Sequence, residues 1–498
     1  MQVLASRRLL PACLALLCAA CAHNAAPPPA ATAQTTPPPE RWYAPLPHGG
    51  DPAALAHWWQ QFDDPLLVQL IEAAQGVSPT LASAVSRIDD ARNARTTAGA
   101  GLLPTVDASA SMTRSRQLQP GFGSLSYTGS QAGAQAAWEI DLFGAQRARR
   151  DAAEQRLEAA RSAWHEARVS VAAEVALRYG DHRFCLRTRG VLERDLASRQ
   201  ETARLTALAA GAGFQAPAAA GLARASAADA AGRYHQQRAQ CEQHVKALVA
   251  LTGLSEPALR ERLAAARADM TAAPPVAVAS LPAALLAQRP DLDAAAREVA
   301  ATRREIDAAD AERLPQLTLG GSVGRTRLSG AGLSSEGTVW SIGPLALAVP
   351  LFDGGRRNAN ADLARARYSA AAAAFEASAR RAVREVEEAL LALQSTAERG
   401  DDAGTAVEGF KQSFDAAEAR YKGGLGSLFE LEDARRSLLG AETARLSLDR
   451  ERLGAWIALY RAVGGGWSGS LSTQGDAQAA LPQADIDRSP PPTPRHER

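Results

Sequence analysis

Long stretches of this chain repeat apolar residues at the spacing of an α-helix. One such seam, with steps of three and four positions, consists of Val383, Val386, Leu390 and Leu393. Between Gly144 and Ala210 the sequence contains no proline that would interrupt a helix. The pattern predicts a helix of roughly 67 residues that ends at a glycine tip, followed by a returning helix of roughly 38 residues.

Other stretches alternate apolar and polar residues at the period of a β-strand. In the first of them Val106, Ala108, Ala110 and Met112 alternate with Thr105, Asp107, Ser109 and Ser111. We predict four strands, which occupy residues 103–116, 125–143, 314–327 and 337–352. Small apolar residues on one face and polar residues on the other are typical of outer-membrane strands. The alternation fits a half-buried soluble sheet equally well.

The chain consists of two copies of one unit. Pro79 matches Pro290 and Pro104 matches Pro315, each roughly 210 positions later. Each copy is predicted to contain a helix (65–100 and 282–313), two strands, a long helix and a returning helix. The first copy is expected to cover residues 58–270 and the second to cover residues 271–463.

The predicted lengths fit together as a tube. A helix of about 67 residues is about 100 Å long, and the two shorter helices of each copy total about 110 Å when placed end to end. Such stacks could line the long helices and build a hollow helical cylinder. Four strands per chain cannot close a membrane barrel, because known barrels start at about 8 strands. Three chains would supply about 12, so we expect a homotrimer.

The two ends of the sequence do not read as folded structure. Residues 1–20 are expected to form a signal peptide, with a basic start and a short apolar segment. Small residues precede Cys21, so we expect this cysteine to carry lipid; an ordinary cleaved signal peptide is the alternative. Residues 21–57 are then a lipidated, disordered tether rich in proline and alanine, and residues 464–498 are a disordered tail.

Composition and charge exclude several functions. The formal net charge of +1 gives no basic surface for nucleic acid. The segment from Gly320 to Gly324, GGSVG, matches a hydrolase elbow, but Ser322 falls within a predicted strand rather than a strand–turn–helix junction. We find no metal-binding or phosphate-binding motif, so we expect neither an enzyme nor a cofactor.

Several motifs together carry a family resemblance. They are HWWQQFDDPLLVQLIEAA near the start, LLP and RLP before strands, DLFG and PLFDGGRR after strands, and ARYKGGLGSLFELEDARRSLL near the end. The chain resembles the TolC-like outer-membrane efflux proteins, and most of all the NodT-type lipoproteins of resistance–nodulation–division systems. The resemblance implies a mainly α fold with membrane β-strands: long α-helical coiled-coil hairpins in a periplasmic tunnel, and a trimeric 12-stranded outer-membrane barrel with four strands per chain.

The same resemblance implies a function. It predicts the exit duct of a tripartite efflux pump, which is anchored in outer-membrane lipid, extends into the periplasm and works with a periplasmic adaptor and an inner-membrane pump. A duct for type I protein secretion has the same architecture and remains an alternative. A periplasmic lipoprotein adaptor is a further alternative, but it would carry one hairpin rather than two.

Three groups of residues are candidate functional positions. Strand-to-helix turns are expected at Phe143, Gly144, Phe352 and Gly354. Adaptor contacts are expected at the glycine tips, which hold Gly211, Gly213, Gly424 and Gly426. A periplasmic gate is expected at Phe429, Asp433 and Arg436, which share one helix face and match the residues that close the aperture in the family. The alternative for this face is a solvated surface with a Glu432–Arg436 pair.

Two further features concern the first copy. Ala220 occupies the position that matches Asp433, so the gate is expected to come from the second copy alone. Cys185 and Cys241 lie at similar distances from the first tip, on opposite arms of the hairpin. A disulfide between them and two separate free thiols are both compatible with the sequence.

Overall fold

The structure is a computed structural model that describes residues 58–119, 123–266, 288–330 and 333–467. The predicted signal peptide, Cys21, the tether and the tail beyond Trp467 lie outside these ranges. In chain order the elements are α2 (Pro65–Val77), α3 (Pro79–Ala100), β1 (Thr105–Gln119), β2 (Gly123–Ile140), α4 (Ala145–Gly211), α5 (Pro217–Thr252), α6 (Glu256–Ala265), α8 (Pro290–Ala311), β3 (Gln316–Gly330), β4 (Leu333–Ala348), α9 (Arg356–Lys422) and α10 (Leu428–Ala462).

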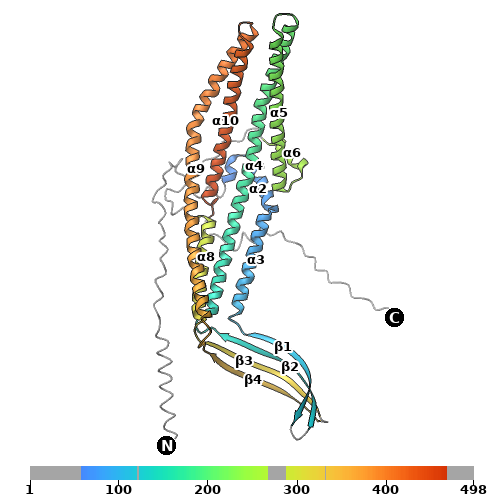
Figure 1. Cartoon of the computed structure of the whole chain (residues 1–498), viewed down its shortest axis with the longest axis vertical. Helices are drawn as coiled ribbons and strands as arrows, with labels where there is room; N and C mark the ends of the chain where they lie inside the picture. The colour runs from blue at the N-terminus through green and yellow to red at the C-terminus, as the bar shows by residue number, and fades with distance from the viewer. Residues whose placement is uncertain (1–57, 120–122, 267–287, 331–332, 468–498) are drawn as a thin grey trace, which may run out of the picture.

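The molecule is long, with a sheet at one end and two helical hairpins at the other (Figure 1). One hairpin is formed by α4 and α5 and the other by α9 and α10, and both turn at the end farthest from the sheet. Helix α3 packs on α4 and helix α8 packs on α9 and α4, between the middle of the molecule and the sheet. The two copies therefore lie side by side with the same orientation.

The helix lengths confirm the predicted tube-like packing. Helices α4 and α9 each contain 67 residues, so each is about 100 Å long. The returning helices α5 and α10 contain 36 and 35 residues and line the upper part of the long helices. Helices α3 and α8, each of 22 residues, line the lower part.

The helices differ from the prediction in three places. The expected helix 65–100 is two helices, because Ser78 is extended and caps α3 while Pro79 occupies its first turn. In the second copy α8 begins at Pro290, whereas the prediction began at Pro282, which lies outside the described residues. Helix α6 was not predicted; it follows Gly253, whose φ of 67° ends α5.

The four strands form one antiparallel sheet in the order β1-β2-β3-β4. The register pairs Thr105 with Ala137, Ile140 with Leu317, and Gln316 with Ala348. Strands β2 and β4 begin at Gly123 and Leu333, a few residues before the predicted positions. Strands β1 and β4 are the two edges, and the outer side of each has no partner strand among the residues that the structure describes.

The main core lies where helices of both copies meet at mid-height. Its aromatic part includes Trp58, which stacks on Tyr460 with 4.9 Å between ring centroids. The Tyr179 hydroxyl donates a hydrogen bond of 2.6 Å to the carboxylate of Asp64, the residue that caps α2. The core therefore fixes α2 against the centre of α4, and the C-terminal end of α10 against both.

Above and below this core the helices approach closely through small side chains. A Cβ atom on Gly180 would lie 2.4 Å from Cδ2 of Leu453, so a larger residue there would force the Leu453 side chain to move. Many of the other buried residues outside the core are alanines, such as Ala223, Ala230, Ala361 and Ala382. The high alanine content thus serves close helix packing.

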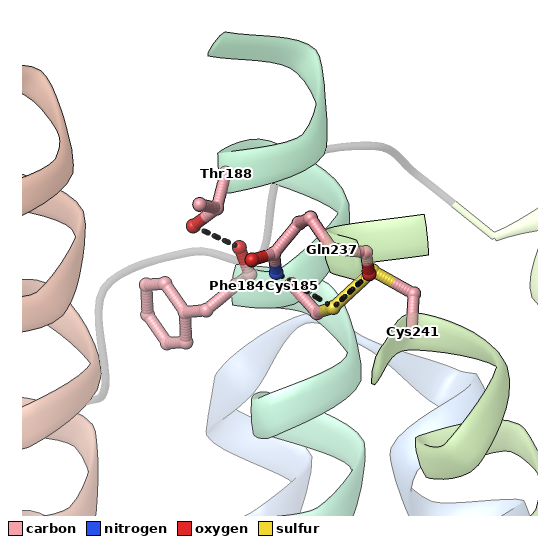
Figure 2. The surroundings of a disulfide bond; sticks show 5 residues. All are labelled: Phe184, Cys185, Thr188, Gln237 and Cys241. Carbon is pink, nitrogen blue, oxygen red and sulfur yellow. Dashed lines mark hydrogen bonds between the residues drawn. A yellow bond between two sulfur atoms is a disulfide. The ribbon is translucent and has the colours of Figure 1, made fainter. Parts of the chain in front are cut away.

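A disulfide joins the two arms of the first hairpin (Figure 2). Cys185 of α4 and Cys241 of α5 are both buried, and their Cα atoms lie 5.5 Å apart. The Gln237 side-chain amide donates a hydrogen bond of 3.0 Å to the Cys185 sulfur. Of the two alternatives that the sequence left open, the structure contains the bridged one.

We predict that reduction of this disulfide loosens the first hairpin selectively. A disulfide that closes a loop of this size typically contributes about 2–4 kcal/mol of stability. Hydrogen–deuterium exchange of α5 should increase in a Cys185→Ser/Cys241→Ser variant. The α9–α10 hairpin contains no cysteine and serves as the internal control. Equal exchange in the variant and the wild type, or peptide mapping that finds both thiols free, would contradict the prediction.

Candidate functional site

Each copy changes from strand to helix at a glycine with a positive φ. Gly144 has φ 83° and precedes α4; Gly355 has φ 89° and precedes α9. Gly354, the predicted turn residue, also has a positive φ of 67°. A residue with a side chain would be strained at any of these positions, so the glycines allow the chain to turn. Phe143 and Phe352, which precede the two turns, are exposed.

Two aspartates that the sequence analysis missed hold these turns. The Asp141 carboxylate accepts hydrogen bonds of 3.0 Å from the backbone amides of Gln146 and Arg147. The Asp353 carboxylate does the same for Gly355 and Arg357, at 3.0 and 3.2 Å. Asp141 stands before the Leu-Phe pair of its motif and Asp353 after it. Because the two positions differ, the motifs alone do not indicate that both aspartates cap a helix.

The environment of Asp141 favours its charged form. Partial burial by itself would raise the pKa of this carboxyl. The hydrogen bonds from the Arg147 and Gln146 amides, together with the Arg147 guanidinium, outweigh burial and hold the pKa below its usual value. The cap therefore stays ionised at neutral pH.

The sheet has one apolar face and one polar face. Residues paired across neighbouring strands point to the same side, so the register assigns both faces. The apolar face carries Val106, Met112, Trp138, Ile140, Leu317, Leu319, Val323, Trp340, Ile342, Leu345 and Leu347. The polar face carries Thr105, Asp107, Ser109, Gln131, Gln135, Thr318, Ser322 and Ser341.

The apolar face is covered by nothing within the described chain. Ile342 is 86% exposed and Met112 is 77% exposed. Large apolar side chains in such numbers on one sheet face are typical of strands that contact lipid, with the polar side facing water. This confirms the predicted alternation and favours the membrane interpretation over the half-buried soluble sheet.

The two hairpin tips have the same backbone turn. The amide of Phe214 donates to the Ala209 carbonyl and that of Leu425 to the Arg420 carbonyl, each at 2.8 Å. Gly213 and Gly424 adopt positive φ values of 77° and 73° in these turns. This is the Schellman arrangement that ends many helices.

The other two tip glycines differ in what surrounds them. A Cβ atom on Gly426 would lie 3.2 Å from the backbone nitrogen of Tyr421, so a side chain there would disturb the turn. A Cβ atom on Gly211, the last residue of α4, would meet no atom within 4 Å. Only Gly211 can therefore be enlarged without changing the local fold.

The predicted gate residues lie on the exposed side of α10, just after the second tip. The helix starts with a capping box formed by Ser427 and Glu430. Phe429 is 73% exposed, and the side chains of Asp433 and Arg436 are exposed as well. The Arg436 guanidinium lies 4.0 Å from the Asp433 carboxylate. The predicted alternative, a Glu432–Arg436 pair, is not present, because the Glu432 carboxylate pairs with Arg199 and Arg435 instead.

Where α10 packs against α4, an ion network joins the two helices. We call Asp195, Arg199, Glu432 and Arg435 the α4–α10 network. The Glu432 carboxylate pairs with both Arg199 and Arg435. Arg199 also contacts Asp195 at 2.9 Å, and Arg435 donates to the hydroxyls of Ser198 and Thr202 at 3.0 and 3.1 Å. The network ties the second copy to the first.

The arginines of the α4–α10 network are buried, so their charges need the carboxylate partners. Arg199 and Arg435 are 7% and 3% exposed. Burial lowers the pKa of the Arg435 guanidinium, and the opposing effect of Glu432 does not fully restore it. Nearer the tip, a hydrogen bond of 2.7 Å between Thr206 of α4 and Tyr421 of α9 also joins the two copies. The sequence shows the spacings within each helix, but not that the two helices meet here.

The described residues offer little that suggests catalysis. Ser322 lies within β3, and its hydroxyl is 2.8 Å from that of Ser341 on the neighbouring strand. In the same ranges, no cluster of three or more His, Cys, Asp or Glu residues is arranged to hold a metal ion. None of the helices found there has an apolar stretch long enough to cross a membrane.

A duplicated helical hairpin unit that ends in a sheet with an exposed apolar face defines the protomer of an outer-membrane channel. The model of the outer membrane efflux protein family matches the chain twice, at residues 70–254 and 281–465. The chain belongs to this family, and the double match confirms the duplication.

Individual relatives agree with this assignment. The pyoverdine export outer membrane protein OpmQ of Pseudomonas putida is 30% identical over 443 residues, which are 87% of this chain and 93% of the relative. Nodulation protein T of Rhizobium leguminosarum bv. viciae is 28% identical and covers 84% of this chain and 86% of its own length. The solved outer-membrane channel OprN is 29% identical, with a TM-score of 0.75 over 86% of this chain and 98% of its own. The protein is thus an outer-membrane component of an efflux system.

Proposed function

We propose that three copies of the chain form a homotrimeric exit duct of a tripartite efflux pump. The observation that carries the proposal is the sheet, whose edges β1 and β4 are unpaired while one face is apolar. An open sheet edge cannot remain in lipid, so β4 of one chain pairs with β1 of the next and three chains close a ring of about 12 strands. The helices then continue the ring as a periplasmic tunnel.

The duct meets its partners at the hairpin tips. A periplasmic adaptor binds there and connects the duct to an inner-membrane pump, which drives small molecules outward. The names of the relatives, which concern export and efflux rather than protein secretion, favour this function over a type I secretion duct. A periplasmic adaptor is disfavoured because the chain has two hairpins attached to one membrane-type sheet. The chain itself is not an enzyme and needs no cofactor.

A Gly211→Leu variant tests both the duct and its docking tips. Because a Cβ atom at Gly211 meets nothing within 4 Å, we expect the trimer to form normally. A deletion strain that expresses the variant should remain about as drug-sensitive as the empty strain, whereas wild-type protein restores resistance.

The control for docking is Gly232→Leu on α5, away from the tip, where an added Cβ also meets nothing within 4 Å. Full resistance with Gly211→Leu would place the docking site elsewhere. If deletion leaves drug sensitivity unchanged but removes a protein from the culture medium, the secretion duct is the correct function.

We further propose that Cys21 is acylated after removal of residues 1–20 and that residues 21–57 tether the chain to the membrane. The small residues before Cys21 and the short apolar segment support this. Cells fed labelled palmitate should incorporate the label into the wild-type protein and not into a Cys21→Ser variant. Label that persists in the variant would show that the lipid is elsewhere.

The gate of the duct is proposed to lie at Phe429, Asp433 and Arg436. Asp433 is about eight residues past the tip, so it stands roughly 12 Å inside the tunnel mouth. Three copies of Phe429 narrow the pore, and three Asp433 carboxylates attract cations. Arg436, 4.0 Å from Asp433, holds the ring together. Ala220 at the matching position of the first copy makes this ring three-fold.

We predict that an Asp433→Ala/Arg436→Ala variant has a higher single-channel conductance and a weaker cation preference in a planar bilayer. The matched control is Lys411→Ala/Asp415→Ala, which removes an exposed ion pair from α9. Glu432→Gln should also increase conductance, because it removes the carboxylate partner of buried Arg435 and so weakens the α4–α10 network that holds the start of α10. Breaking such a buried pair typically costs about 3–5 kcal/mol. Wild-type conductance in both gate variants would mean that the constriction lies elsewhere.

A further inference from the structure

Four arginines follow the apolar residues on the apolar face of the sheet. They are Arg114 and Arg116 of β1 and Arg325 and Arg327 of β3. The register places Met112, Ser130, Arg327 and Glu336 in one row across the four strands. The arginines therefore form a single patch, which we call the arginine patch, at the end of the strands far from the helices.

The charges of the arginine patch are largely uncompensated. Arg325 pairs with Glu336 at 3.2 Å, and Arg116 donates to the Ser124 hydroxyl at 2.8 Å. Arg114 and Arg327 make no hydrogen bond or ion pair with any residue that the structure describes. The side chain of Arg325 remains 72% exposed. Of the four arginines, only Arg325 thus has an acidic partner among the described residues.

The patch borders a shallow hollow on the same face. Its volume is about 480 Å³, and its lining includes Ala110, Met112, Ala132, Arg325, Arg327 and Glu336. Ala110, Met112 and Ala132 give the lining an apolar part, whereas Arg325 and Arg327 supply two cations and Ser130 adds a hydroxyl. A ligand with an apolar part beside an anionic group fits this arrangement.

The height of the patch agrees with the boundary of a membrane. Eight residues separate Leu317, near the helices, from Arg325, which is about 27 Å along a strand at about 3.4 Å per residue. With the usual tilt of about 40°, this corresponds to about 20 Å of height, and Arg327 lies higher still. The outward apolar band of outer-membrane barrels is about 25 Å tall. The arginines therefore stand at its far margin, on the side opposite the periplasmic helices.

We propose that the arginine patch binds the phosphate groups of lipids in the outer leaflet, with the hollow receiving the adjoining apolar part of the lipid. A guanidinium forms paired hydrogen bonds with a phosphate, and it binds more strongly where hydrocarbon excludes water. The inference rests on the proposed barrel, which directs the apolar face outward. Each chain carries the same patch, so the lipids form a ring around the duct.

The test uses the purified trimer and two probes, lipid A with its phosphates and lipid A from which they have been removed. Native mass spectrometry measures how much lipid each trimer retains. We expect phosphorylated lipid A to bind at least about tenfold more tightly than the dephosphorylated form, and an Arg114→Gln/Arg327→Gln variant to lose about as much affinity. The matched control, Arg224→Gln/Arg238→Gln, removes two exposed arginines from α5 and should bind like the wild type.

Three outcomes would overturn the proposal. They are equal binding of both lipids by the wild type, wild-type affinity in the Arg114/Arg327 variant, and complete displacement of lipid by millimolar inorganic phosphate, which would indicate a site for free phosphate. Trimer formation and conductance are measured on the same preparations. Loss of both in the wild type would refute the barrel itself, whereas conducting trimers without phosphate-dependent lipid retention refute only the arginine patch as a lipid site.

Discussion

The unpaired backbone groups along β1 and β4 constrain everything else in this molecule. Each edge carries N–H and C=O groups that water cannot reach in a lipid layer, and leaving them unpaired would cost several kcal/mol each. A chain with four strands can satisfy these groups only with copies of itself. The helices must therefore fit around the same axis as the strands, which explains why two long helices of 67 residues run side by side in one direction.

The two copies of the unit have the same backbone fold but differ in the side chains of their hairpins. Both turn from strand to helix at a glycine capped by an aspartate, and both end in the same glycine turn. The first copy is stiffened by the Cys185–Cys241 disulfide. The second carries the exposed Phe429 and Asp433, and it is attached to the first by buried Glu432 and Arg435. In the proposed gate, the disulfide-bridged first hairpin would therefore be the fixed surface against which the second moves.

Much of this architecture follows from local sequence, and the exceptions have physical reasons. Missing prolines and the heptad seam predicted α4 and α9 correctly, and period-two alternation predicted the faces of the sheet. The break at Ser78 was missed because Pro79 can begin a helix as readily as it ends one. The partners of Glu432 were missed because Arg199 lies more than two hundred residues away along the chain. The sequence left the disulfide open, since spacing from the tip fixes the height of a cysteine but not the direction in which it faces.

A wall built from several chains also has a genetic consequence. In the proposed trimer every ring needs three intact sheets, since one defective edge leaves the facing edge of the neighbouring chain unpaired. If a cell makes equal amounts of normal protein and of a form with a damaged β1 or β4, random mixing leaves only about one ring in eight free of the damaged form. Damage to an edge strand should therefore behave as a dominant trait, while loss of the whole chain is recessive.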